Sequence, residues 1–436
     1  KDDQFSFALR PIWGIEYLSN DNDAFSRTWG AGRIYGQIGE HVGFYASLRD
    51  NHMTHVLSRP EHFTQREGGV YKGNSLGGGD YSEMRGGITY GWDWGDVSLI
   101  KDHLEWGDNY NGANIRTGRA PSIGMIKLHL KPARWFEFNY YHGWLVSEVV
   151  DSLESYTPVS GFERSAYKPK YMAANMFTVI PTPNIHFSFG NSIVYGDIPV
   201  QAGYLVPFMF FKSIDHTINA NIENQNSQMF ANLSIRSIKH LHLYGALYID
   251  EFSFSRLGDP NRHNFNSWKA GAKLTNWPLR NIALTFETTQ TSPLTFKHRI
   301  PVLTYATNEF NLGHYMRDNS QDYYIELDIN PLPRFHLKAS YLYAAHGNEY
   351  PYIRNGTYEL DEYPFMKEKS WSNETLAFEA DFEFSSNAYI FLGYHIRNIQ
   401  GYNVDGKPAS YYLSRFTPEM FHRETETLRF GFNVGF

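Results

Sequence analysis

The feature that most constrains the fold is an alternation of apolar and polar residues that recurs along the whole chain. At the C-terminus, one side of a strand carries Leu428, Phe430, Phe432, Val434 and Phe436, and the other carries Arg429, Gly431, Asn433 and Gly435. Residues 376–384 and 323–330 alternate in the same way. Successive strand residues point to opposite faces, so the pattern predicts strands with one apolar and one polar face. A membrane barrel explains both faces, with lipid outside and a wet lumen inside, whereas aromatic-rich strands of this length are unusual in a soluble sandwich.

The composition excludes several other classes of protein. Aromatic residues make up 17% of the 436 residues, which argues against disorder. No run of about 18 apolar residues exists, which argues against a helical membrane protein. The net charge is −7 and basic residues are not concentrated anywhere, so we expect no nucleic-acid partner. The absence of cysteine excludes disulfides, a thiol nucleophile and thiolate metal ligands.

The order of strands and connections predicts the architecture. We expect eighteen strands, at 5–18, 26–38, 42–53, 82–93, 96–106, 122–131, 134–147, 170–181, 185–196, 227–238, 240–252, 265–276, 280–291, 322–330, 334–346, 375–384, 388–400 and 425–436. Short connections such as 182–184 alternate with long ones such as 54–80 and 292–321. This predicts an all-β, transmembrane, antiparallel up-and-down β-barrel of about 18 strands, forming a single domain over 1–436, with short periplasmic turns and long extracellular loops. We expect a bacterial outer-membrane location, and numbering that begins after a removed signal peptide.

Charged residues on the polar faces are expected to line the lumen. The turn at 330–334 predicts Glu326 opposite Lys338 and Asp328 opposite His336, and the turn at 385–387 predicts Glu379 opposite His395. These pairs either neutralise one another in the barrel wall, which we favour, or form a polar path for a solute or glycan.

The sequence contains no convincing catalytic or metal-binding motif. The segment 73–77 matches the pattern Gly-x-Ser-x-Gly but lies in a glycine-rich loop without the strand and helix that a nucleophile elbow needs. His240 and His242 have a spacing that can hold zinc, but no third ligand is evident. We therefore expect a protein that is not an enzyme and has no cofactor and no metal.

The segment 106–121 combines the residue types that bind sugars. Trp106 and Tyr110 offer faces for stacking, Asn109 and Asn111 can bond hydroxyls, and Arg116 and Arg119 can bind an acidic group. The alternative is a glycine-rich turn packed in the barrel mouth, in which Arg119 pairs with Glu105 or Asp108.

A second segment, 203–211, is the longest apolar stretch and falls in an expected outer loop. Its aromatic residues are Tyr204, Phe208, Phe210 and Phe211. We expect this loop to fold inward as a lumen plug, so that serine at positions 208 and 210 would raise conductance. A partner-binding surface is the second interpretation.

The residues at 103–112, 118–122 and 131–132 resemble the Wzi capsule-assembly family, and 207–211 is similar to its relatives in Bacteroidota. The resemblance implies an 18-stranded outer-membrane barrel that holds capsular polysaccharide at the cell surface, with membrane lipid and polysaccharide as partners. Two alternatives stay open. The first is a channel or export pore for glycans or solutes. The second is a subunit of a larger outer-membrane complex with other outer-membrane proteins or lipoproteins, docked through loops 197–226 and 292–321.

Overall fold

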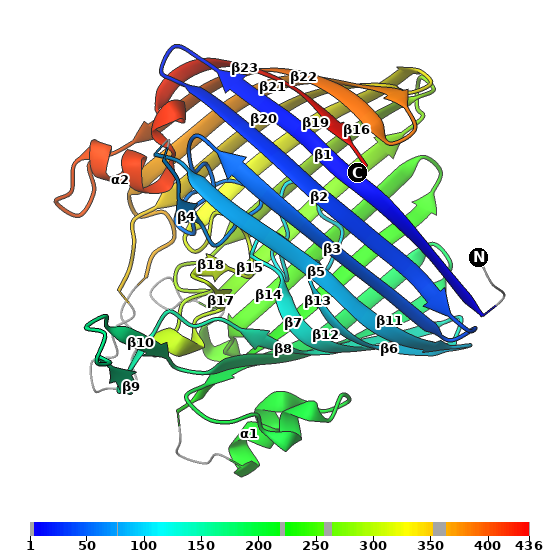
Figure 1. The fold of residues 1–436 in the computed structure, drawn as a ribbon, viewed down its shortest axis with the longest axis vertical. Helices are drawn as coiled ribbons and strands as arrows, with labels where there is room; N and C mark the ends of the chain where they lie inside the picture. The colour runs from blue at the N-terminus through cyan, green and yellow to red at the C-terminus, as the bar shows by residue number, and fades with distance from the viewer. Residues whose placement is uncertain (1–3, 76, 219–222, 257–263, 352–362, 436) are drawn as a thin grey trace.

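Eighteen long antiparallel strands form one closed barrel in the computed structural model, which describes residues 4–75, 77–218, 223–256, 264–351 and 363–435 (Figure 1). The first strand pairs with both the second and the last, so no long edge is left open. The predicted barrel and its number of strands are therefore confirmed. The barrel strands are β1 Phe5–Ser19, β2 Ala24–Ile38, β3 Val42–Met53, β5 Gly79–Trp92, β6 Gly95–Asp102, β7 Ile123–Ala133, β8 Phe136–Leu145, β11 Lys170–Thr182, β12 Ile185–Gly196, β13 Gln225–Ile238, β14 Leu241–Glu251, β15 Phe265–Thr275, β16 Ile282–Thr291, β19 Ser320–Leu332, β20 Phe335–Gly347, β21 Lys369–Ser385, β22 Ala388–Gly401 and β23 Arg423–Val434.

Short turns join the strands at one end of the barrel, the turn end, and long connections join them at the other, the loop end. The connections carry the short strands β4 Lys72–Gly73, β9 Val150–Tyr156, β10 Arg164–Tyr167, β17 Ala306–Thr307 and β18 Phe310–Asn311, and the helices α1 Phe211–Ile218 and α2 Ala409–Phe416. They also carry four 3-10 helices, η1 Ala202–Leu205, η2 Phe254–Arg256, η3 Pro301–Leu303 and η4 Glu419–Phe421. Among the described residues, no helix is both long enough and apolar enough to cross a bilayer.

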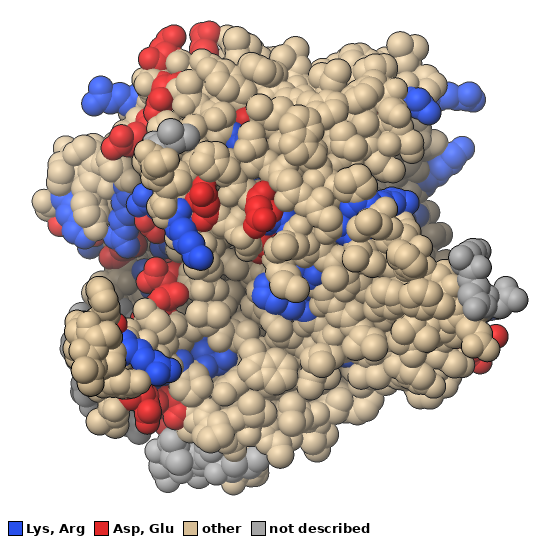
Figure 2. All heavy atoms as spheres, in the orientation of Figure 1, with Lys and Arg blue, Asp and Glu red and all other residues tan. Residues whose placement is uncertain are grey.

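The outer face of the wall carries exposed apolar side chains from most strands. Phe7, Leu99 and Leu392 are more than half exposed, and Trp94, Trp135 and Trp277 lie at the turn end. Such a band is stable in lipid, and aromatic residues border it in membrane barrels. Most acidic residues visible in Figure 2 lie toward the loop end. The wall is thus built to span a membrane.

Two predicted cross-strand registers are wrong. Glu326 lies opposite Ser340 and Asp328 opposite Lys338, while Glu379 lies opposite Gly393. His395 lies opposite Ala377. The cause is that both turns are tighter than predicted and are accompanied by a register shift, at Ile329/Leu332 and at Glu383/Ser385. Each partner moves by two residues, so the same side chains still face the lumen.

Loops fill the loop end of the lumen through two apolar clusters. In the first, Phe63 stacks on Phe416 at 4.2 Å and meets Trp371 edge-on at 5.1 Å, which joins the connection after β3 to α2 and β21. In the second, Trp106 packs against Tyr141 and Phe230, each at 5.4 Å. Strand β6 accordingly ends at Asp102 instead of the predicted 106, because the chain leaves the wall there and enters the lumen.

The predicted lumen plug at 203–211 is wrong. Tyr141 of β8 contacts the lumen residue Trp106, so alternation places its neighbour Tyr140, and with it Phe138, on the outer face. Phe208 stacks on Phe138 at 4.4 Å, and the Tyr140 hydroxyl donates to the Tyr204 carbonyl. This connection therefore lies against the outside of the barrel, as Figure 1 shows for α1. Serine at positions 208 and 210 is not expected to open the lumen.

The seam between β1 and β23 is the pairing that closes the barrel, and the absence of native cysteine makes it testable. Ile15 and Phe432 lie directly opposite one another, so Ile15→Cys with Phe432→Cys should form a disulfide on oxidation. That bond closes a loop of most of the chain, so the unfolded protein should migrate faster without reductant. Ile15→Cys with Leu428→Cys is the control, because Leu428 pairs with Ser19. Equal cross-linking of both pairs would contradict the seam.

Candidate functional site

The connection 103–122 descends into the lumen and is held there by one buried carboxylate. Glu287 of β16 accepts the backbone N–H groups of Tyr110 and Asn111, each at 2.9 Å. It also accepts the Tyr244 hydroxyl at 2.7 Å and pairs with Lys269 of β15 at 2.9 Å. The side chains of Lys269 and Glu287 are fully buried. Since a buried charge is stable only when paired and hydrogen-bonded, this cluster fixes where the loop lies.

A second carboxylate ties this loop to the connection 292–319. Asp322 of β19 accepts the Asn111 side-chain amide at 2.9 Å and lies 3.2 Å from His314 Nε2. Gly112, between these anchors, has φ +96° and packs so closely that a Cβ atom would meet the Tyr315 ring at 2.8 Å. Glycine is required there for both reasons. The two connections thus form one packed unit inside the barrel.

A polar pocket of about 280 Å³ lies between this unit and the connection after β3. Its lining residues are Gln65, Glu67, Glu105, Asn109, Tyr110, Gly112, Thr117, Gly118, Arg119 and Tyr315. The volume is just below the usual range for ligand pockets, so the pocket suits a small polar group or one unit of a polymer. Lys273 lies 4.4 Å from the Tyr110 ring centre, on a neighbouring part of the lumen wall.

The six predicted sugar-contact residues divide into two groups. Asn109 and Tyr110 are half-buried and line the pocket, whereas Asn111 is buried in its bonds to the wall. Trp106 and Arg116 form a β-bridge with each other and are 8% and 2% exposed. The structure thus brings Asn109, Tyr110 and Arg119 together at one pocket and places the others in packing positions.

Arg119 does not pair with Glu105 or Asp108, so that alternative is wrong. Its Nη2 donates to the carbonyls of Arg59 and His62 at 2.7 and 3.0 Å, which ties 103–122 to the connection after β3. Its Nε and Nη1 donate to none of the described residues. Burial, helped by the nearby Arg317 guanidinium, lowers the pKa of Arg119.

Asp108 pairs instead with Arg236 at 3.0 Å, and Glu105 accepts the Asn109 amide at 3.2 Å. The first contact joins the loop to the wall, and the second lies within the loop. Because Asp108 bonds a residue near the turn end of β13, the loop reaches deep into the barrel.

The lumen wall around the closing seam carries a connected set of ion pairs. Glu16 pairs with Arg66 at 3.2 Å and with Arg429 at 2.8 Å. Arg429 also bonds Glu379 at 3.0 Å, and Glu379 bonds Lys338 at 2.7 Å. Sequence reasoning found Glu379 and Lys338 but missed Glu16 and Arg429, because they meet only across the closing seam.

The remaining predicted lumen residues join the same wall. His336 lies 3.0 Å from Asp328 as a diagonal contact, and His395 lies 3.5 Å from Glu379. Glu326 accepts the Tyr324 hydroxyl at 2.6 Å. The two histidine–carboxylate contacts fit mutual neutralisation in the wall, whereas Glu326 bonds a neutral hydroxyl.

Within the described part of the chain, one group of side chains has metal-ligand geometry. Ligand atoms of Glu67, Glu83 and His103 lie within 4.8 Å of one another. Arg49 and Arg27 already pair with Glu67, which reduces the charge available to a cation. His240 and His242, whose spacing could have held zinc, do not converge, because His240 bonds the Thr275 carbonyl and His242 faces Asp108 and Ser234. The expected absence of a metal stays a prediction.

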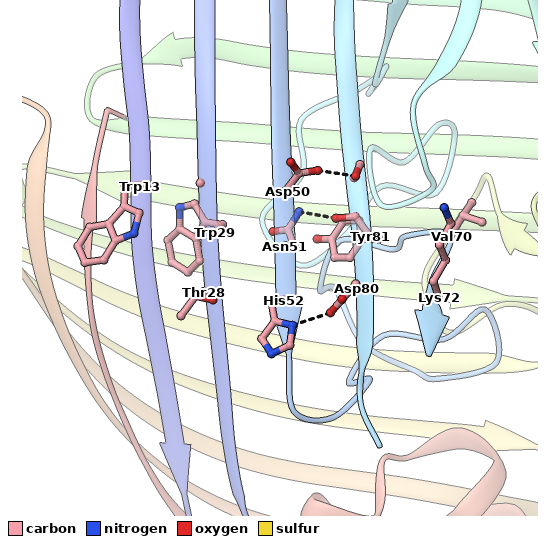
Figure 3. A pocket seen from close by; sticks show the side chains of 12 residues that line it. Trp13, Thr28, Trp29, Asp50, Asn51, His52, Val70, Lys72, Asp80 and Tyr81 are labelled. Carbon is pink, nitrogen blue, oxygen red and sulfur yellow. Dashed lines mark hydrogen bonds and ion pairs between the residues drawn. The ribbon is translucent and has the colours of Figure 1, made fainter. Parts of the chain in front are cut away.

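A larger pocket, about 640 Å³, opens on the outer wall near the loop end of β1, β2, β3 and β5 (Figure 3). His52 bonds Asp80 at 2.7 Å and Asp50 bonds Ser82, and the exposed ring of Trp13 lines the opposite side of the pocket (Figure 3). In a membrane barrel this height corresponds to lipid head groups, so we assign this pocket to the lipid interface.

The comparisons with solved structures agree on the fold. Wzi from Escherichia coli, described as an outer-membrane protein involved in group 1 capsule assembly and a carbohydrate-binding β-barrel, is similar with a TM-score of 0.56 at 10% identity, over 97% of this chain and 84% of that one. OccD3 (OpdP) of Pseudomonas aeruginosa gives 0.53 at 11%, over 98% and 90%. OccAB2 of Acinetobacter baumannii gives 0.51 at 10%, over 98% and 97%. No protein-family model and no curated protein sequence matches the chain.

Removing the carboxylate of Glu287 should release the loop. Glu287→Ala leaves Lys269 charged and buried without a partner, so we expect a loss of about 3–5 kcal/mol in the free energy of unfolding, measured by urea titration in detergent. The double variant Lys269→Met with Glu287→Gln should recover much of this loss, because it removes the unpaired charge. Additive losses in the double variant would contradict the coupling.

Proposed function

We propose that the protein is a non-catalytic outer-membrane barrel that binds surface polysaccharide, with the lumen pocket as a contact for one sugar unit. The observation that carries this proposal is the packing of the loop end. The two apolar clusters join four connections to the wall across the mouth, which suits a binding protein better than an open pore.

The chemistry of the pocket supports a sugar ligand. Tyr110 offers a ring face, while Asn109, Gln65 and Thr117 offer amides and a hydroxyl for bonding to sugar hydroxyls. Glu67 and Glu105 can accept hydroxyl protons in the same space. An acidic glycan would be drawn to the neighbouring cations Lys273 and Arg236 on the wall.

The resemblance to the Wzi family falls on the same part of the chain. The residues that carry it, 103–112 and 118–122, build the loop that reaches into the lumen and lines the pocket. Wzi itself is described as carbohydrate-binding, and its fold covers nearly all of this chain. Membership of that family is part of the proposal.

Removing the ring and amide at the pocket should weaken polysaccharide retention. We expect Tyr110→Ala with Asn109→Ala to lower cell-bound polysaccharide at least several-fold, measured as the ratio of attached to released polymer. Tyr341→Ala is the matched control, because this tyrosine faces outward and is 41% exposed. Heat-modifiable migration should be unchanged in all variants. Full retention by a folded double variant would contradict the proposal.

A solute channel is the second candidate function, and the charged lumen wall favours it. The connected pairs from Glu16 to Lys338 line the lumen around the closing seam, and OccD3 and OccAB2 share the fold. The two functions predict different conductance in planar bilayers. We expect rare, small openings from the native protein and larger steps when residues 105–118 are replaced by a short glycine-serine linker. Steady large conductance of the native protein would favour the channel.

A further inference from the structure

The connection between β12 and β13 lies on the lipid-facing wall and is fixed there by two asparagines. Asn175 Nδ2 donates to the carbonyls of Pro207 and Met209, each at 2.8 Å, and Asn191 Oδ1 accepts the N–H of Phe211 at 2.9 Å. Lipid cannot bond these backbone groups, so the asparagines make irregular backbone tolerable at this depth. These bonds explain why two polar side chains, Asn175 and Asn191, occur on a lipid-facing wall.

The depth of this segment follows from the strand beside it. Asn191 is six residues from Ile185, the turn-end residue of β12. At about 3.3 Å per residue and a tilt near 40°, Phe211 lies about 15 Å above the turn end. The apolar band of a membrane barrel is about 25 Å tall, so α1 begins well inside it. The exposed apolar residues Phe187, Phe189 and Met229 nearby agree with this placement.

Helix α1 presents polar side chains at that depth. Lys212, Ser213, His216 and Thr217 are exposed, while Phe211 is buried against the wall. A lysine facing lipid near the midplane costs about 2–4 kcal/mol. A polar group from a neighbouring protein would remove most of this cost, whereas acyl chains would not.

The same flank carries a second uncovered surface beyond the membrane. The hairpin β9–β10 leaves the barrel between β8 and β11, next to the strands that carry α1. Its connection and strands expose Leu153, Val159 and Phe162 by 80% or more. Apolar side chains that protrude into water mark an interaction surface.

We propose that this flank, α1 with the β9–β10 hairpin, is the docking surface for a different integral outer-membrane protein that presents an acidic or hydrogen-bonding side chain to Lys212. The partner is a membrane protein because one half of the surface lies in the apolar band and the other half above it. The partner must present an acidic or hydrogen-bonding side chain, because that is what complements Lys212 and His216.

A second copy of this chain fits the surface less well. Its outward acidic residues include Glu374, Glu424 and Glu426, toward the loop ends of β21 and β23, and Asp50 and Asp80, toward the loop ends of β3 and β5. All of them lie above the depth of α1. Strand β22 lies between β21 and β23. It is the ninth barrel strand after β11, so it lies on the opposite side of the eighteen-strand barrel. Pairing opposite flanks would give an open row of copies instead of a closed oligomer.

Photo-cross-linking in the native outer membrane tests this proposal on the full chain. A benzoylphenylalanine residue is placed at Met209, at Leu153 or, as a lipid-facing control, at Leu392 on the opposite wall; these side chains are 44%, 93% and 57% exposed. We expect Met209 and Leu153 to capture the same integral membrane protein, identified by mass spectrometry, and Leu392 to capture none. In the Met209 background, Lys212→Glu should lower capture at least tenfold and Lys212→Arg should preserve it, with heat-modifiable migration confirming insertion.

Four results would overturn the proposal. They are the absence of a protein product at Met209, capture of a second copy of the chain, capture of different proteins at the two positions, and capture that is unchanged in an inserted Lys212→Glu variant. If Lys212→Glu does not insert, Lys212→Gln gives the same comparison without a new charge. The result is independent of polysaccharide retention, because none of these residues lines the lumen pocket.

Discussion

The pairing of every backbone N–H and C=O group is the constraint on which the rest of this structure depends. Lipid offers no hydrogen bonds, so strands that span it must close on themselves, and β1 meets β23 for that reason. The same requirement explains Asn175 and Asn191, which bond the backbone of a loop that lies in the apolar band. Two unrelated features, the seam and the outward asparagines, thus have one physical cause.

Inside the barrel, the need to pair buried charges determines where the loops lie. The wall is polar there, and water or protein groups must satisfy it. Glu287 receives donors from the loop, from Tyr244 and from Lys269, so the position of the loop follows from one carboxylate on the wall. The apolar clusters then fill the space above it. A lumen occupied in this way leaves a small polar pocket, which is why we connect the loop to binding.

The barrel therefore uses its long connections in two opposite ways. Residues 103–122 fold inward and build a candidate ligand site, whereas residues 197–218 fold outward and extend the membrane-facing wall. The two surfaces are separated by the thickness of the wall. Polysaccharide binding and association with another membrane protein are compatible in one molecule for that reason.

The sequence by itself determined the number of strands, their order and the apolar belt, because a period of two is a local property that reports which face each residue occupies. It also identified Asn109, Tyr110 and Arg119 as part of a chemically rich segment. Register depended on bulges at Ile329 and Glu383 that local alternation does not record. Whether an aromatic loop enters the lumen or lies on the outer wall was decided by partners far away in the chain. Glu287 holds one loop from 176 residues away, and Phe138 and Asn175 hold the other, so only the closed barrel could assign each loop its side.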